Sequence, residues 1–143
     1  MKKRVLVPLA TGFEEIEAVT IVDVLRRAGV EVIVAGLSAG ILEGSRGIRL
    51  QPDTTLERVQ LDSFDAIGVP GGMGGPLCML ESPPLLEALR KHHTAGRLTA
   101  AICAAPLVLE RAGLVDGKRV TAHPSVCDRL GRALFCAEPR VVR

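Results

Sequence analysis

Short apolar segments alternate with helical segments along most of this chain. Strands are predicted over residues 4–9, 31–36, 66–69, 98–102 and 119–121, and helices over 14–28, 83–95 and 104–113. A glycine-rich turn or short hairpin is predicted over 36–47, and a short helix over 56–61. Strands and helices that alternate in this way form a mostly parallel sheet with helices on both faces, so the sequence predicts an α/β fold.

The composition excludes several classes of function. A chain of 143 residues forms one domain, and its formal net charge of +2 creates no strong field for nucleic acid. It has no Trp or Tyr to stack on single-stranded bases. The apolar stretch after Arg4 is interrupted by Pro8 and Gly12, so it is too short for a signal peptide, and no segment is long enough to cross a membrane. We therefore expect a cytoplasmic protein without nucleic-acid or membrane partners.

The cysteines and histidines show no metal-binding pattern. The four cysteines, Cys78, Cys103, Cys127 and Cys136, include no Cys-x-x-Cys pair. They form no ligand spacing with His92, His93 or His123. In the absence of an export signal we expect reduced thiols and no metal.

Cys103 follows the apolar run 98–102, which is predicted to be a buried central strand, and precedes the helix predicted over 104–113. Pro106 suits the first turn of that helix and Gly113 suits its end. The thiol is thus predicted at a sharp strand-to-helix turn, the position of the nucleophile in α/β-hydrolases. Free N–H groups at a helix N-terminus favour an anion, so we expect a lowered pKa for Cys103. The alternative is that Cys103 is a small buried hydrophobic residue.

Several chemically interesting segments follow predicted strand ends. They are residues 10–17, 70–72, 103–104 and 123–124. In open α/β sheets, ligands bind at the carboxyl ends of the strands, so these segments are predicted to converge. Glu17, the glycine N–H groups of Gly71 and Gly72, and His123 would then surround the thiol. Each also has a structural interpretation: Glu17 as a first-turn acid, 70–72 as a tight turn, and His123 as a surface loop residue.

These residues resemble the ThiJ/PfpI superfamily, in the branch of the Parkinson's-disease-associated glyoxalase/deglycase and its bacterial relatives. The matching motifs are AAICAAP at 100–106, GFEEIE at 12–17, DVLRRAG at 23–29, VPGG at 69–72 and VTAHP at 120–124. The resemblance implies a flavodoxin-like three-layer αβα sandwich and a homodimer. It also implies a reactive Cys103 against a protonated Glu17, with His123 nearby.

The resemblance further maps the backbone donors for an oxyanion onto Gly72 and Ala104. It maps a pocket arginine, often supplied by the partner subunit, onto Arg26 or Arg27. The protease-like branch has a histidine after the nucleophile, where this chain has Ala104, which argues against peptidase activity. Members of the family continue with another strand and a closing helix, so we expect the single domain 1–143 to lack these final elements, and a strand to begin at Val141–Val142.

The resulting hypothesis is a cysteine enzyme without a cofactor that acts on small aldehydes or early glycation adducts. A first alternative is a redox sensor or redox-regulated chaperone that uses oxidation of Cys103. A second alternative, an amidotransferase-like domain, lacks a recognisable synthetase partner and a His–acid pair. The first helix carries apolar residues around much of its circumference, which predicts a dimer contact through that helix.

Overall fold

The computed structural model describes residues 2–138 and 140–143. A five-stranded parallel sheet has the order β5-β2-β1-β6-β7. Its strands are β1 (Arg4–Leu9), β2 (Glu31–Gly36), β5 (Thr54–Thr55), β6 (Ala66–Val69) and β7 (Leu98–Ala101). The mostly parallel, flavodoxin-like α/β fold predicted from the sequence is confirmed. Because all five strands run in the same direction, their carboxyl ends meet at one edge.

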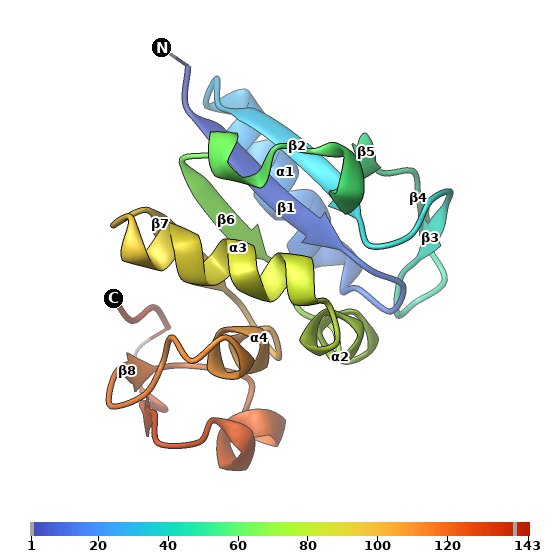
Figure 1. Cartoon of the computed structure of the whole chain (residues 1–143). Coiled ribbons are helices and arrows are strands. Elements are labelled where there is room, and N and C mark those ends of the chain that lie inside the picture. The colour runs from blue at the N-terminus through green and yellow to red at the C-terminus, as the bar shows by residue number, and fades with distance from the viewer. Residues whose placement is uncertain (1, 139) are drawn as a thin grey trace.

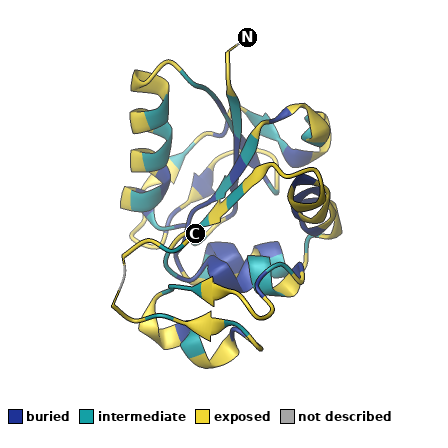
Figure 2. Ribbon diagram, turned by 90° about the vertical axis from the view of Figure 1, so that its left-hand side faces the viewer, coloured by how far each residue is buried: buried dark blue, intermediate teal, exposed yellow. Residues whose placement is uncertain are grey.

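Helices cover both faces of this sheet. Figures 1 and 2 show α1 (Glu15–Arg27) on one face and α3 (Pro83–Thr94) on the other, and α2 (Gly74–Leu80) and α4 (Pro106–Arg111) lie beyond the strand ends. Alternate residues of β2 point to opposite layers: Val34 packs with Ala18 on the α1 side, and Ala35 belongs to the cluster that contains Leu85 of α3. Both faces of the strands are therefore buried at the centre of the sheet.

Smaller elements surround this frame. The strands β3 (Leu42–Glu43) and β4 (Arg49–Leu50) form an antiparallel hairpin, which confirms the hairpin alternative for this region. The 3₁₀ helices η1 (Leu56–Arg58) and η2 (Leu61–Ser63) replace the short helix predicted over 56–61. A second small sheet pairs β8 (Arg119–Val120) with β9 (Leu134–Phe135), and η3 (Pro124–Arg129) lies between these strands in the sequence.

The ends of α1 follow from its sequence. Glu14 is the N-cap, and its carboxylate accepts a 2.9 Å hydrogen bond from the backbone N–H of Glu17. Arg26 and Arg27 lie in the last turn, where cations are favoured, and Gly29 follows with a positive φ of 82°. α3 begins at Pro83, as predicted, and the residue before it, Ser82, makes no side-chain capping hydrogen bond.

The strand before Cys103 differs from its prediction. β7 is the edge strand of the sheet, not a central one, and Leu98 is 65% exposed. Hydrophobic composition could not distinguish the two positions, because a short apolar run is compatible with either, and β7 pairs with the single strand β6. The strand predicted at 119–121 is also outside the main sheet, and residues 141–142 form no strand.

Candidate functional site

Cys103 lies in the sharp turn between the end of β7 at Ala101 and the start of α4 at Pro106. Its φ of 61° makes it the one non-glycine residue with positive φ in the described part of the chain. This left-handed conformation is strained for a residue with a Cβ, and such residues concentrate at functional sites. The predicted elbow is therefore present, with a partly buried thiol.

Glu17 reaches the same edge of the sheet from the first turn of α1. Its Oε2 accepts a 2.8 Å hydrogen bond from the backbone N–H of Gly71, which follows β6. The backbone N–H of Glu14 donates in return to the carbonyl oxygen of Gly71, at 3.0 Å. These two bonds, between residues far apart in the sequence, fix the start of α1 against the loop that contains Gly71.

Gly71 is needed because the site leaves no room for a side chain. A Cβ at this position would lie 2.5 Å from the Cβ of Cys103 and 2.5 Å from Oε2 of Glu17. Gly72 has a φ of 87°, and a Cβ there would collide with the carbonyl oxygen of Gly12. The glycines predicted from the turn signal therefore allow three chain segments to meet.

The ionisation of Cys103 reflects these neighbours. Burial raises the pKa of the Cys103 thiol, the N–H groups of Gly72 and Ala104 lower it, and the charge and hydrogen bond of Glu17 raise it again. The net direction is upward, so the expected lowering of the pKa is wrong. The donors at the turn are present as predicted, but desolvation and the adjacent carboxylate outweigh them.

His123 lies beside Cys103 through its backbone. Its N–H donates to the carbonyl oxygen of Cys103 at 2.8 Å, while its exposed ring accepts from the backbone N–H of Ser125 through Nδ1. Val126 of η3 packs with Ala104 in a small apolar cluster against Cys103. His123 thus reaches the site by this route and not through a strand of the main sheet.

Arg26 and Arg27 are not brought to this site within one chain. Both lie at the end of α1 opposite Glu17. Arg26 donates to Asp53 at 2.8 Å and to the carbonyl oxygen of Val32, and Arg27 pairs with Asp23 at 2.8 Å. A contribution of either arginine from a partner subunit remains a prediction.

The sequence reasoning treated two acids beside Glu17 as part of a motif without a role of their own. Glu14 is the N-cap of α1, and its side chain accepts from the backbone N–H of Glu17. Glu15 is only 5% exposed and accepts hydrogen bonds from the β3–β4 hairpin. A signal for this was available, because three acids within four residues at a helix start exceed what one cap needs.

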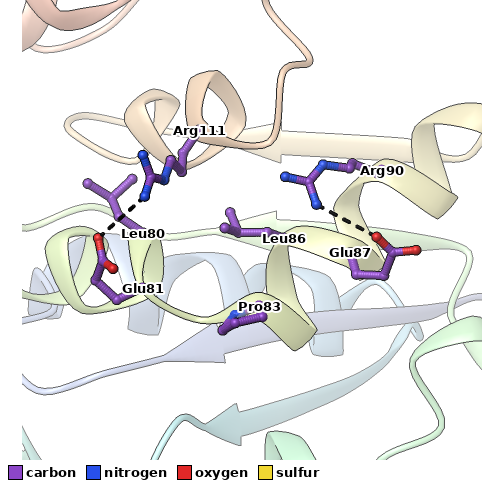
Figure 3. A pocket seen from close by; sticks show the side chains of 7 residues that line it. All are labelled: Leu80, Glu81, Pro83, Leu86, Glu87, Arg90 and Arg111. Carbon is purple, nitrogen blue, oxygen red and sulfur yellow. Dashed lines mark ion pairs between the residues drawn. The ribbon is translucent and has the colours of Figure 1, made fainter.

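A separate hollow of about 550 Å³ lies between α2, α3 and α4. Figure 3 shows two ion pairs beside it: Arg111 of α4 with Glu81, which follows α2, at 3.9 Å, and Arg90 with Glu87, both on α3, at 3.6 Å. It contains no nucleophile and none of the predicted site residues.

Within residues 2–138 and 140–143, no group of three or more His, Cys, Asp and Glu side chains is placed to hold a metal ion. No helix in these same ranges combines the length and apolar character needed to cross a membrane.

Comparisons with known proteins match nearly the whole chain. The model of the DJ-1/PfpI family matches residues 3–143. The sequence is 47% identical over 131 residues to "Protein dj-1beta" of Drosophila melanogaster, covering 91% of this chain and 70% of that protein. It is 40% identical over 117 residues to "Glutathione-independent glyoxalase DJR-1.2" of Caenorhabditis elegans, covering 82% of this chain and 62% of that protein. The crystal structure of Drosophila DJ-1beta superimposes with a TM-score of 0.95 at 43% identity, covering all of this chain and 78% of that one.

Proposed function

Because this chain belongs to the DJ-1/PfpI family, we propose that it is a cysteine enzyme acting on reactive carbonyls, without a cofactor. The substrates would be glyoxal or methylglyoxal, or early glycation adducts of thiols and amines. One observation carries the proposal: the Cys103 thiol faces the carboxyl group of Glu17 and the N–H groups of Gly72 and Ala104. A relative bearing the name of a glutathione-independent glyoxalase supports it.

The first step is attack of the Cys103 sulfur on the aldehyde carbon of methylglyoxal. A carbon–sulfur bond forms, the carbonyl π bond opens, and the oxygen takes the proton that Glu17 holds to give a hemithioacetal, which leaves Glu17 as a carboxylate. The N–H groups of Gly72 and Ala104 supply donors for the negative charge that develops on this oxygen.

Glu17 then moves protons between the two carbons of the substrate. It removes the proton from the former aldehyde carbon and returns one to the neighbouring ketone carbon, while the proton of the first hydroxyl passes to the ketone oxygen, so the first carbon is oxidised as the second is reduced. The product is a thioester, which water attacks to break the carbon–sulfur bond. A hydroxy acid leaves and the thiol is restored, so no external oxidant or reductant is used.

Cys103 and Glu17 share one proton in this proposal. A thiolate and a carboxylate side by side repel each other, so the pair holds its one proton to a higher pH than the two groups would if they were far apart. Burial is the largest cause of the raised pKa of Cys103, and repulsion by Glu17 adds to it. The reactive form has the thiolate on Cys103 and the proton on Glu17, which is then ready to act as an acid.

The same geometry supports a second candidate function, that of a redox sensor. The Cys103 thiol is partly exposed, and Gly72 and Ala104 offer N–H donors to an oxidised sulfur as readily as to an oxyanion. Turnover separates the two functions, because a sensor changes its own sulfur once and does not consume aldehyde.

We also propose a homodimer that forms through α1. Ile16, Val19 and Val24 of this helix are 75%, 48% and 55% exposed, although all three are large hydrophobic residues. Ile41 and Ile48, in the hairpin region whose Leu42 and Leu50 pack against α1, are also exposed, at 62% and 57%. A twofold contact would cover these side chains in the commonest way.

The decisive experiment measures methylglyoxal consumption by the purified protein. Cys103→Ser should abolish it, and Cys78→Ser should not, because Cys78 is an exposed thiol of α2 outside the site. No consumption by the wild-type protein, or equal consumption by the Cys103→Ser variant, would exclude the enzymatic proposal.

A further inference from the structure

Glu15 is a buried carboxylate that the proposed reaction does not use. It is 5% exposed, and it lies in the first turn of α1, two residues before Glu17. We propose that Glu15 is a positioning residue, which fastens the β3–β4 hairpin to α1 and thereby holds Glu17 in place, an inference that rests on the function proposed for Glu17.

The contacts of Glu15 are concentrated on one short segment. Its Oε1 accepts from the backbone N–H of Arg46 at 2.6 Å and from that of Ile48 at 3.4 Å, and its Oε2 accepts from the hydroxyl of Ser45 at 3.1 Å. A Cβ on Gly44 would lie 2.5 Å from the carboxyl carbon of Glu15, so the hairpin closes tightly over this side chain. These bonds satisfy donors inside the turn that the hairpin cannot pair itself.

Charge on Glu15 strengthens this attachment. Burial alone would raise the pKa of its carboxyl group, but the hydrogen bonds from Arg46, Ser45 and Ile48 outweigh burial and lower it. The carboxylate is therefore the form that the fold prefers at neutral pH. Hydrogen bonds to a charged acceptor are stronger than neutral ones.

A continuous set of backbone bonds connects the hairpin to the site. Ser45 N–H donates to the carbonyl oxygen of Phe13 at 2.8 Å, and Gly12 N–H donates to that of Glu43 at 2.8 Å. The backbone N–H of Glu14, the residue after Phe13, donates to the carbonyl oxygen of Gly71, and the N–H of Gly71 donates in turn to the Glu17 carboxylate. The hairpin thus supports the loop before α1 from the outside, while Gly71 supports it from the inside.

The test replaces Glu15 by Gln, which keeps the shape of the side chain but removes its charge. Amide hydrogen exchange should become at least about tenfold faster at Arg46, Ile48 and Gly71, because charged hydrogen bonds are lost or weakened. The pH profile of Cys103 alkylation by iodoacetamide should move to lower pH, since a displaced Glu17 no longer raises the pKa of the thiol. Ser45→Ala, which removes one bond at an exposed residue, should give smaller changes in the same direction.

The matched control is Glu43→Gln. Glu43 belongs to the same hairpin, but its side chain makes only a surface ion pair with Arg49 at 3.6 Å. This variant should exchange and react like the wild type.

Two results would overturn the proposal. Faster exchange in the hairpin with unchanged Gly71 exchange and an unchanged alkylation profile would make Glu15 a support of the hairpin alone. No change in any of these measurements would show that the hydrogen bonds of Glu15 stabilise neither the hairpin nor the position of Glu17. Both readouts are independent of turnover, so a wild-type protein that consumes no methylglyoxal would refute the proposed function and leave this inference standing.

Discussion

The backbone N–H of His123 donates a 2.8 Å hydrogen bond to the carbonyl oxygen of Cys103. Cys103 itself holds a strained φ of 61°, so a bond to its own peptide group restrains the turn that presents the thiol. The segment around η3, which is outside the main sheet, is thus attached directly to the candidate nucleophile.

This bond can be removed by a substitution whose φ the backbone already has. His123 has a φ of −61°, which proline also adopts, so His123→Pro removes the N–H donor, whereas His123→Ala keeps it. We expect His123→Pro to lose more unfolding free energy, relative to His123→Ala, than the roughly 0.5–1.5 kcal/mol of one hydrogen bond, because the proline ring also presses on the Cys103 carbonyl oxygen; urea denaturation measures this. Equal stability of the two variants would show that the bond is dispensable. If only the imidazole matters for catalysis, both variants should lose the same turnover.

Replacing Glu17 tests the proton transfer. Glu17→Leu removes the acid and base while keeping an apolar side chain of similar size, so turnover of methylglyoxal should fall by about 10²–10⁴-fold. Initial rates at saturating substrate measure this, with Glu43→Gln as the control for loss of a surface carboxylate. A Glu17→Leu variant with normal turnover would rule out the shuttle.

The pH dependence of Cys103 follows from its raised pKa. Only the thiolate is alkylated, so the reaction with iodoacetamide should rise with pH through a midpoint above that of an ordinary cysteine. In Glu17→Gln the neighbouring charge is gone, and the midpoint should move to lower pH while remaining affected by burial. The measurement is mass-spectrometric labelling of Cys103 across a pH series. A midpoint that does not move in this variant would separate the thiol from Glu17.

Gly71 and Gly68 form a matched pair for testing the tightness of the site. In Gly71→Ala the new methyl group collides with Cys103 and Glu17, so we expect a loss of about 1–3 kcal/mol and a strong loss of turnover. Gly68 lies in β6, before Gly71 in the sequence. A Cβ added at Gly68 meets no atom closer than 4.0 Å, so Gly68→Ala should be tolerated. Thermal unfolding and turnover of both variants check this. An active, fully stable Gly71→Ala protein would contradict the geometry.

The dimer prediction concerns the exposed surface of α1. Sedimentation at micromolar concentration should give a dimer for the wild-type chain and a monomer for Ile16→Lys combined with Val19→Lys, because the charges prevent burial of this face. Val141→Lys is the control, since Val141 is 78% exposed and outside the α1 surface. A wild-type monomer, or a dimer that survives both lysines, would place any association elsewhere.

Sequence reasoning predicted the parts of the fold that local signals determine. The bounds of β1, β2 and β6 agree with their predictions, since each is a short apolar run ended by turn residues. The helix α2 was missed because its first turn contains Gly74, Gly75 and Pro76, which ordinarily indicate a loop. Its formation depends on tertiary packing, since Gly75 and Pro76 are buried and Met79 is fully enclosed in the core.

The site was predictable in its members but not in its energetics. Because ligands bind at the carboxyl ends of parallel strands, the sequence predicted that Glu17, Gly71 and Cys103 lie close together. The structure adds the hydrogen bond between Gly71 and Glu17. The sign of the Cys103 pKa shift was not predictable, because it depends on how deeply the thiol is buried beside Glu17. The position of Arg26 and Arg27 could have been inferred, since the last turn of α1 lies at the opposite end from its first.

Because synthesis runs from the N-terminus, the residues that surround the turn at Cys103 become available one after another. Glu17 and Gly71, which are 54 residues apart, both emerge from the ribosome before Cys103, whereas His123 emerges after it. During this interval the thiol has its acidic neighbour available and lacks the donor that restrains its peptide group. Oxidation or alkylation of this sulfur in a growing chain would therefore occur before the bond from His123 exists, and a pause in translation after Cys103 has emerged but before His123 has would lengthen that exposure.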